Sequence, residues 1–111
     1  MSVFRLEAGV HMPIDSRYVG SVEVEIANRG SKDLNMWIQM FAPSGLVNEM
    51  LVDVKAGATR RLQTMNTNEQ PFTLLMISNT NRYDSTDIIL TARRDGGLVA
   101  IFNQHHFDRV H

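Results

Sequence analysis

The chain has 111 residues, of which 43% are hydrophobic and 21% are charged. This length and balance predict one soluble globular domain with a single core and exclude a disordered chain. The formal net charge is −1, which argues against a general binder of nucleic acids or membrane surfaces. The sequence contains no cysteine, which excludes disulfides, thiolate nucleophiles and Cys-ligated zinc.

The N-terminal segment bears on where the protein resides. Arg5 and Glu7 interrupt the apolar stretch that a secretory signal would need. No apolar run approaches the ~18 residues of a transmembrane helix. We therefore expect a protein that is cytoplasmic on synthesis and has no membrane partner, with later incorporation into a larger particle left open.

Period-two alternation of apolar and polar side chains is frequent in the sequence, whereas helical spacing is hard to find. Residues 1–19 are expected to form an N-terminal strand or arm, and residues 109–111 a short tail. Segment 58–63 is mostly polar, so we expect it at a sheet edge, where charge discourages further pairing. In chain order, the sequence predicts strands at residues 20–28, 34–41, 46–54, 58–63, 72–79, 86–94 and 98–107.

Turn signals separate these strands. In Ala-Pro-Ser-Gly, Pro43 fixes φ and Gly45 is able to adopt a positive φ, which predicts a tight turn. Asp95-Gly96 between two apolar strands is the best hairpin signal in the chain. Residues 64–71 and 79–85 are rich in Asn and predict loops.

Seven or eight short strands over residues 20–108 predict an all-β protein built as an antiparallel β-sandwich. A small barrel would also satisfy the strand count, and a jelly roll is the rival architecture. We expect residues 1–111 to form a single domain.

Part of the sequence is similar to a known class of domains. The stretch VEVEIANRGSKDLNMWIQMF resembles the strand–Asn-x-Gly–strand opening of small bacterial immunoglobulin-like domains, and VKAGATRRL resembles the Ala-Gly-x-Thr turn that follows in them. The resemblance covers roughly residues 20–63 and rests on turn residues. It implies an immunoglobulin-like sandwich that mediates adhesion or assembly. The chain departs from antibody-type domains in lacking their cysteine pair.

Several predicted strands are apolar on both faces, although a two-layer domain requires only one apolar face. Within residues 34–41, Trp37 and Phe41 share the face opposite Met36 and Met40. Residues 72–77, 88–92 and 98–102 have the same property. This pattern predicts a partner surface, namely another copy of the chain in a dimer or trimer. The alternative is that Trp37 lies under a loop. The seven methionines fit either an interface or a core.

Patterns for metal binding and catalysis are weak. His106 and Asp108 are the best candidate pair for a metal, but zinc needs three or four ligands. Glu23 and Glu25 fit a solvated strand face better than a catalytic pair of carboxylates. No nucleophile elbow or glycine-rich phosphate loop is present. We expect no cofactor, no metal and no enzymatic activity; the enzymatic alternative is a site around His106 and Asp108 that two subunits share.

Arginine supplies nine of the eleven basic residues, and it is common in protein interfaces. Arg60, Arg61 and Arg93 are candidates for contact with an acidic partner, a phosphate or a sugar. The favoured alternative is pairing with Glu23, Glu25 or Glu49 of the same chain, or charge that guards a sheet edge. Together with Trp37, Phe41 and Tyr83, these arginines would suit a groove that stacks single-stranded nucleic acid, but the net charge argues against such a partner.

These observations favour a non-enzymatic module that self-associates and serves assembly or protein–protein interaction, as in a phage, a spore layer or another bacterial particle. The expected interface residues are Trp37, Phe41, Tyr83, Arg60, Arg61 and Arg93. The alternative is a small domain that binds carbohydrate or another ligand. Its aromatic and amide surface would comprise Trp37, Tyr83, Asn66, Asn68, Asn79 and Asn81.

Overall fold

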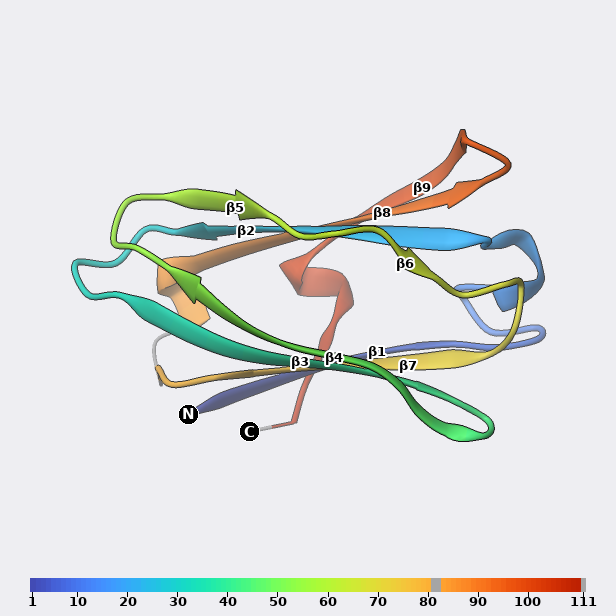
Figure 1. The fold of residues 1–111 in the computed structure, drawn as a ribbon, viewed down its shortest axis with the longest axis horizontal. Helices are drawn as coiled ribbons and strands as arrows, with labels where there is room; N and C mark the ends of the chain where they lie inside the picture. Colours follow the sequence, from blue (N-terminus) through green and yellow to red (C-terminus); the bar gives the residue numbers. More distant parts are fainter. Residues whose placement is uncertain (81–82, 111) are drawn as a thin grey trace.

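The computed structural model describes residues 1–80 and 83–110, without the side chain of Tyr83. Two antiparallel sheets stack face to face, which confirms the predicted all-β sandwich (Figure 1). The first sheet has the strand order β10 (Asp108–Arg109), β1 (Ser2–Ala8), β7 (Phe72–Ser78), β3 (Leu34–Ala42) and β4 (Gly45–Val54). The second has the order β5 (Thr59–Arg61), β2 (Ser21–Asn28), β8 (Thr86–Arg94) and β9 (Gly97–Asn103), and β6 (Met65–Asn66) also pairs with β2.

The core fills the space between the two sheets with the inward-facing residues of each strand. In β2, Val22, Val24 and Ile26 are fully buried, so the apolar side of its alternating pattern is the core face. Met36 and Met40 of β3 are also buried, as are Met65 and Met76. Packing in the core therefore accounts for four of the seven methionines.

Both predicted turns are confirmed. Ala42 pairs with Gly45 across a two-residue loop, and Gly45 adopts a φ of 120°. Asp95 and Gly96 both have positive φ, of 53° and 81°, which is the backbone of a type I′ turn between β8 and β9. The right-handed twist of the strands favours this turn because its own twist matches theirs.

The end of the chain differs from the expectation. The strand predicted to run to residue 107 stops at Asn103, whose side chain accepts a hydrogen bond from the His105 N–H and caps the 3-10 turn η3 (Gln104–His106). The chain then crosses to the first sheet, where Arg109, expected in a tail, pairs with Phe4 of β1. No helical segment among the described residues is long and apolar enough to span a membrane.

A second 3-10 turn, η1 (Ser16–Tyr18), is fixed by an ion pair that makes stability depend on pH. The Arg17 guanidinium donates two hydrogen bonds to Asp15, at 3.0 and 2.6 Å, and the Arg17 N–H donates a third at 3.1 Å. These bonds, chiefly those from the side chain, hold the pKa of Asp15 well below its ordinary value of 3.8. Because the folded-state pKa is the lower one, the stabilisation is present above about pH 4 and is lost as the pH falls further.

We therefore expect the free energy of unfolding to fall less in acid for Asp15→Asn than for the unmodified chain. The measurement is urea unfolding of both proteins at intervals between about pH 7 and pH 2. The difference between them should be largest near neutral pH and shrink in acid. Added salt should also reduce it, because an exposed pair is screened. A difference that grows in acid would contradict the assignment.

Candidate functional site

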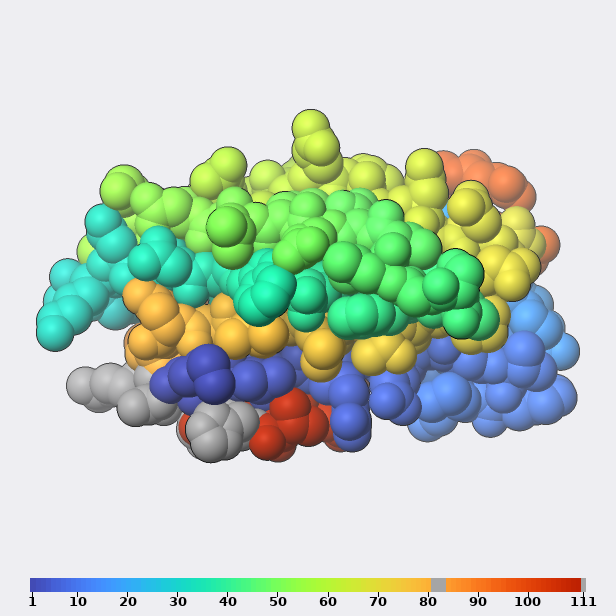
Figure 2. Space-filling model, turned by 60° about the horizontal axis from the view of Figure 1, so that its bottom comes forward, coloured from blue at the N-terminus to red at the C-terminus, as the bar shows by residue number. Residues whose placement is uncertain are grey.

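An apolar row crosses the outer face of the first sheet. The registers of four strands place Val3 beside Ile77, Ile77 beside Trp37, and Trp37 beside Leu51. Residues directly opposite on neighbouring strands point to the same face, so these side chains form one band perpendicular to the strands. Figure 2 shows this face, with β4, β3, β7 and β1 as successive green, cyan, orange and blue bands.

The row is open to solvent. Leu51 is 81% exposed and Trp37 is 39% exposed, whereas Ile77 is half-buried. A shallow hollow of about 420 Å³ lies along the row, and Met1 and Ile77 line it together with Trp37 and Leu51. The outward position of Trp37 means that it does not complete the core of its own chain.

Polar side chains hold Trp37 in place and border the row. The indole N–H of Trp37 donates a 2.6 Å hydrogen bond to Glu49 on β4, which satisfies the polar edge of the ring. The next row across the same strands begins with Arg5, passes through Leu75 and Gln39, and ends with Glu49. At the β1 side the Arg5 guanidinium lies 3.4 Å from Glu7 and 4.0 Å from Asp108, so its charge is paired within the chain.

The structure brings only some of the predicted interface residues together. Trp37 and Phe41 both lie on this face, and Phe41 is half-buried opposite Leu46. The Tyr83 side chain lies outside the part of the chain that the structure describes.

The three predicted arginines bind groups of their own chain. Arg61 pairs with Glu25 at 3.6 Å, and Arg93 pairs with Glu23 at 3.4 Å. Arg60 donates a 3.1 Å hydrogen bond to the backbone oxygen of Asp53. The alternative reading, pairing of arginines with Glu23 and Glu25, therefore describes two of the three.

The candidate metal pair has other contacts. His106 lies in η3, where its Nδ1 accepts a hydrogen bond from the Asn103 N–H at 3.1 Å and its ring packs edge-on against Phe102. Asp108 begins β10, 4.0 Å from the Arg5 guanidinium. Among residues 1–80 and 83–110, no group of three or more His, Asp or Glu side chains is placed to hold a metal ion.

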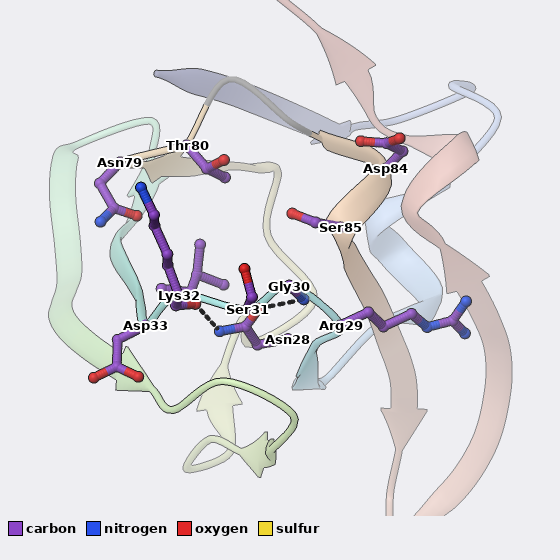
Figure 3. Close-up of a pocket in the computed structure, with 11 residues that line it drawn as sticks. Asn28, Arg29, Gly30, Ser31, Lys32, Asp33, Asn79, Thr80, Asp84 and Ser85 are labelled. Atoms are coloured by element: carbon purple, nitrogen blue, oxygen red, sulfur yellow. Dashed lines mark hydrogen bonds between the residues drawn. The ribbon is translucent and has the colours of Figure 1, made fainter.

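A polar cavity of about 700 Å³ lies at one end of the sandwich, between the β2–β3 loop and the segment that follows β7 (Figure 3). Its polar groups are largely engaged in holding the loops. The buried amide of Asn28 donates to the oxygens of Lys32 and Val54 and accepts from the Gly30 N–H. Arg29 points away from the cavity and pairs with Asp87. This cavity is better explained as the closure of the loops than as a ligand site.

The two Asn-rich loops lie at opposite ends of the molecule. Asn66 pairs with Ser21 at the start of β2, whereas Asn79 bonds the backbone of Asn35 at the start of β3. Of the asparagines that the structure describes, Asn35 and Asn79 line the hollow beside Trp37. Asn81 lies outside the described residues.

Comparisons of the chain with protein-family models, with curated proteins and with solved structures gave no match. The row is an exposed band of apolar side chains, and its contact with water is unfavourable.

Proposed function

We propose that the protein is a non-enzymatic, self-associating β-sandwich module, and that its interface is the outer face of the first sheet. The observation that carries the proposal is the row Val3–Ile77–Trp37–Leu51, in which four strands present apolar side chains in register to solvent. Water contact with such a band is unfavourable, and a second copy removes it.

The face has a suitable area. Four strands about 4.8 Å apart, each seven residues long at about 3.3 Å per residue, cover roughly 450 Å² in projection. Side-chain relief makes the accessible area larger than the projection, which brings it near the ~800 Å² that each partner buries in a standard interface. The face is therefore large enough to be one side of a specific interface.

The face is also complementary to itself. A two-fold axis that runs along the strands lays the β1 side of one copy over the β4 side of the other. Val3 then lies over Leu51 of the second copy, and Ile77 lies over Trp37. The same operation brings Arg5, which is already paired with Glu7 and Asp108 of its own chain, toward Glu49, so burial of the apolar row and not charge pairing would hold the two copies together. Two outer faces packed in this way form a four-layer assembly with layers about 10 Å apart.

The test is the mass of the protein in solution at micromolar concentration, by sedimentation velocity. We expect the unmodified chain to sediment as a dimer or larger species. Trp37→Ala should raise the dissociation constant of this interface at least about 30-fold, because a central aromatic anchor contributes about 2 kcal/mol or more. Leu51→Arg should do the same without affecting the fold, since Leu51 is almost fully exposed.

The matched control is Tyr18→Ala, which removes an exposed aromatic side chain far from this face. It should leave the mass unchanged. A monomeric unmodified chain, or a mass that Trp37→Ala and Leu51→Arg both leave unaltered, would rule the proposal out.

A second candidate function rests on the grouping of Trp37 with Asn35 and Asn79 around the hollow. An aromatic ring beside amide side chains suits a sugar, with the ring stacking on its apolar face and the amides binding its hydroxyls. This function predicts that Trp37→Ala abolishes binding to a glycan array and leaves the mass unchanged. The opposite pattern supports self-association.

A further inference from the structure

The strand β9 is an unguarded edge of the second sheet. It pairs with β8 on one side and with no other described strand on its other side. Figure 1 shows the β8–β9 hairpin projecting beyond the sandwich. Three apolar side chains of β9 are exposed: Leu98 is 59%, Val99 44% and Ile101 58% exposed. A row of unpaired backbone groups beside such side chains is a template for another strand.

The other edges carry charge. β4 contains Glu49 and Asp53, β5 contains Arg60 and Arg61, and β10 consists of Asp108 and Arg109. Charged side chains on an edge oppose pairing with further strands. Of the described edge strands with three or more residues, β9 alone has no charged side chain, because its sequence is GLVAIFN. Among these described edges of three or more residues, the part of β9 from Ala100 to Asn103 therefore has neither a charge nor a bulge to protect it.

The sequence of β9 suits pairing with its own copy. The residues Leu98 to Phe102 are five successive apolar side chains. Ala92 pairs with Ala100 but Arg93 pairs with Leu98, so Val99 forms a bulge near the turn and the regular strand begins at Ala100. If β9 pairs with β9 of a second copy in antiparallel orientation, with Ile101 at the centre of the pair, the contact involves only this regular part. It places Ile101 against Ile101 on the outer face and the small Ala100 opposite the large Phe102 on the inner face.

We infer that two copies of this chain join along β9 in antiparallel register centred on Ile101. The two β9 strands then lie side by side, so the β5-β2-β8-β9 sheets of the two copies form one continuous sheet. This interface does not depend on the one proposed above and lies on the other sheet. A subunit with two isologous interfaces forms a closed dihedral assembly or a linear polymer, so such a chain would build particles or fibres from copies of itself.

The test uses the absence of cysteine from the chain. In the proposed register Ile101 lies directly opposite its own copy, at a Cα separation of about 4.5–5.5 Å, which a disulfide spans. Ile101→Cys should therefore oxidise to a covalent dimer in nearly full yield. Val10→Cys, at a position 49% exposed in a loop, is the control and should cross-link slowly and only at high protein concentration.

The masses of single and double variants in solution distinguish the β9 interface from the interface on the first sheet. Ile101→Lys should remove the β9 interface and leave a dimer, and Leu51→Arg should leave a dimer that Ile101→Cys still cross-links. The variant with both Leu51→Arg and Ile101→Lys should be a monomer. The inference on β9 is overturned if Ile101→Cys cross-links no faster than Val10→Cys, or if the Leu51→Arg variant is a monomer. Either result holds whether or not the outer face of the first sheet forms an interface.

Discussion

We expect Leu74→Ala to lower the free energy of unfolding by about 2–5 kcal/mol, and Leu75→Ala, one residue along the same strand, to lower it by less than about 1 kcal/mol. Leu74 points into the core from β7 and is fully buried, whereas Leu75 points to the outer face and is half-buried. The first substitution removes buried methyl groups and leaves a cavity between the sheets. The second leaves the core intact.

The pair is matched in residue type, strand and substitution, so the backbone propensities cancel. Unfolding in urea is the measurement, repeated in the background of Leu51→Arg with Ile101→Lys, which is expected to be a monomer, so that loss of association does not enter the comparison. Similar losses for Leu74→Ala and Leu75→Ala would mean that a single subunit buries both faces of β7. That result would remove the physical reason for proposing a partner on the outer face.

The sequence predicted the strands and their faces because alternation is a local signal. Trp37 and Met36 are neighbours, and their opposite faces follow from the period of two. Asp95-Gly96 predicted its hairpin for the same reason, since the requirement for positive φ is met within two residues.

The apolar row could not be predicted in this way. Val3, Ile77, Trp37 and Leu51 come from four strands, and they are neighbours only because the registers of three strand pairs align them. Register between distant strands is set by core packing as a whole and has no local sequence signal. Leu51 was therefore missed, although its exposure makes it the most accessible member of the row.

The role of Asn28 was missed for the same reason. The Asn-Arg-Gly segment predicted a turn, and Gly30 does donate to the Asn28 side chain at 3.0 Å. The other partners are the oxygen of Lys32, at 2.8 Å, and the oxygen of Val54, at 3.0 Å. Val54 ends β4 in the first sheet, and Asn28 ends β2 in the second. This buried amide therefore ties the two sheets together beside the polar cavity.

We expect Asn28→Ala to lower the free energy of unfolding by about 2–4 kcal/mol, because it removes three hydrogen bonds and leaves the buried Val54 oxygen without its donor. Urea unfolding is the measurement. Asn66→Ala, at an exposed position on the other end of the sandwich, is the control and should change the value by less than about 0.5 kcal/mol. Equal effects at the two positions would show that the Asn28 amide does not join the sheets.

Asn28→Asp separates the loss of donors from the loss of shape. The carboxyl group fits the same space and still accepts from Gly30, but a carboxylate would face the oxygens of Lys32 and Val54 without a proton to offer them. Burial and these oxygens raise the pKa of the introduced carboxyl group above its value in the unfolded chain. Its protonated form is therefore favoured in the folded protein, so the variant loses stability as the pH rises from about 4 toward neutrality. Asn28→Asp should thus be less stable than Asn28→Ala at pH 7 and approach or exceed it near about pH 3. A pH-independent difference between the two variants would mean that water reaches this position and that the polar cavity extends to Asn28.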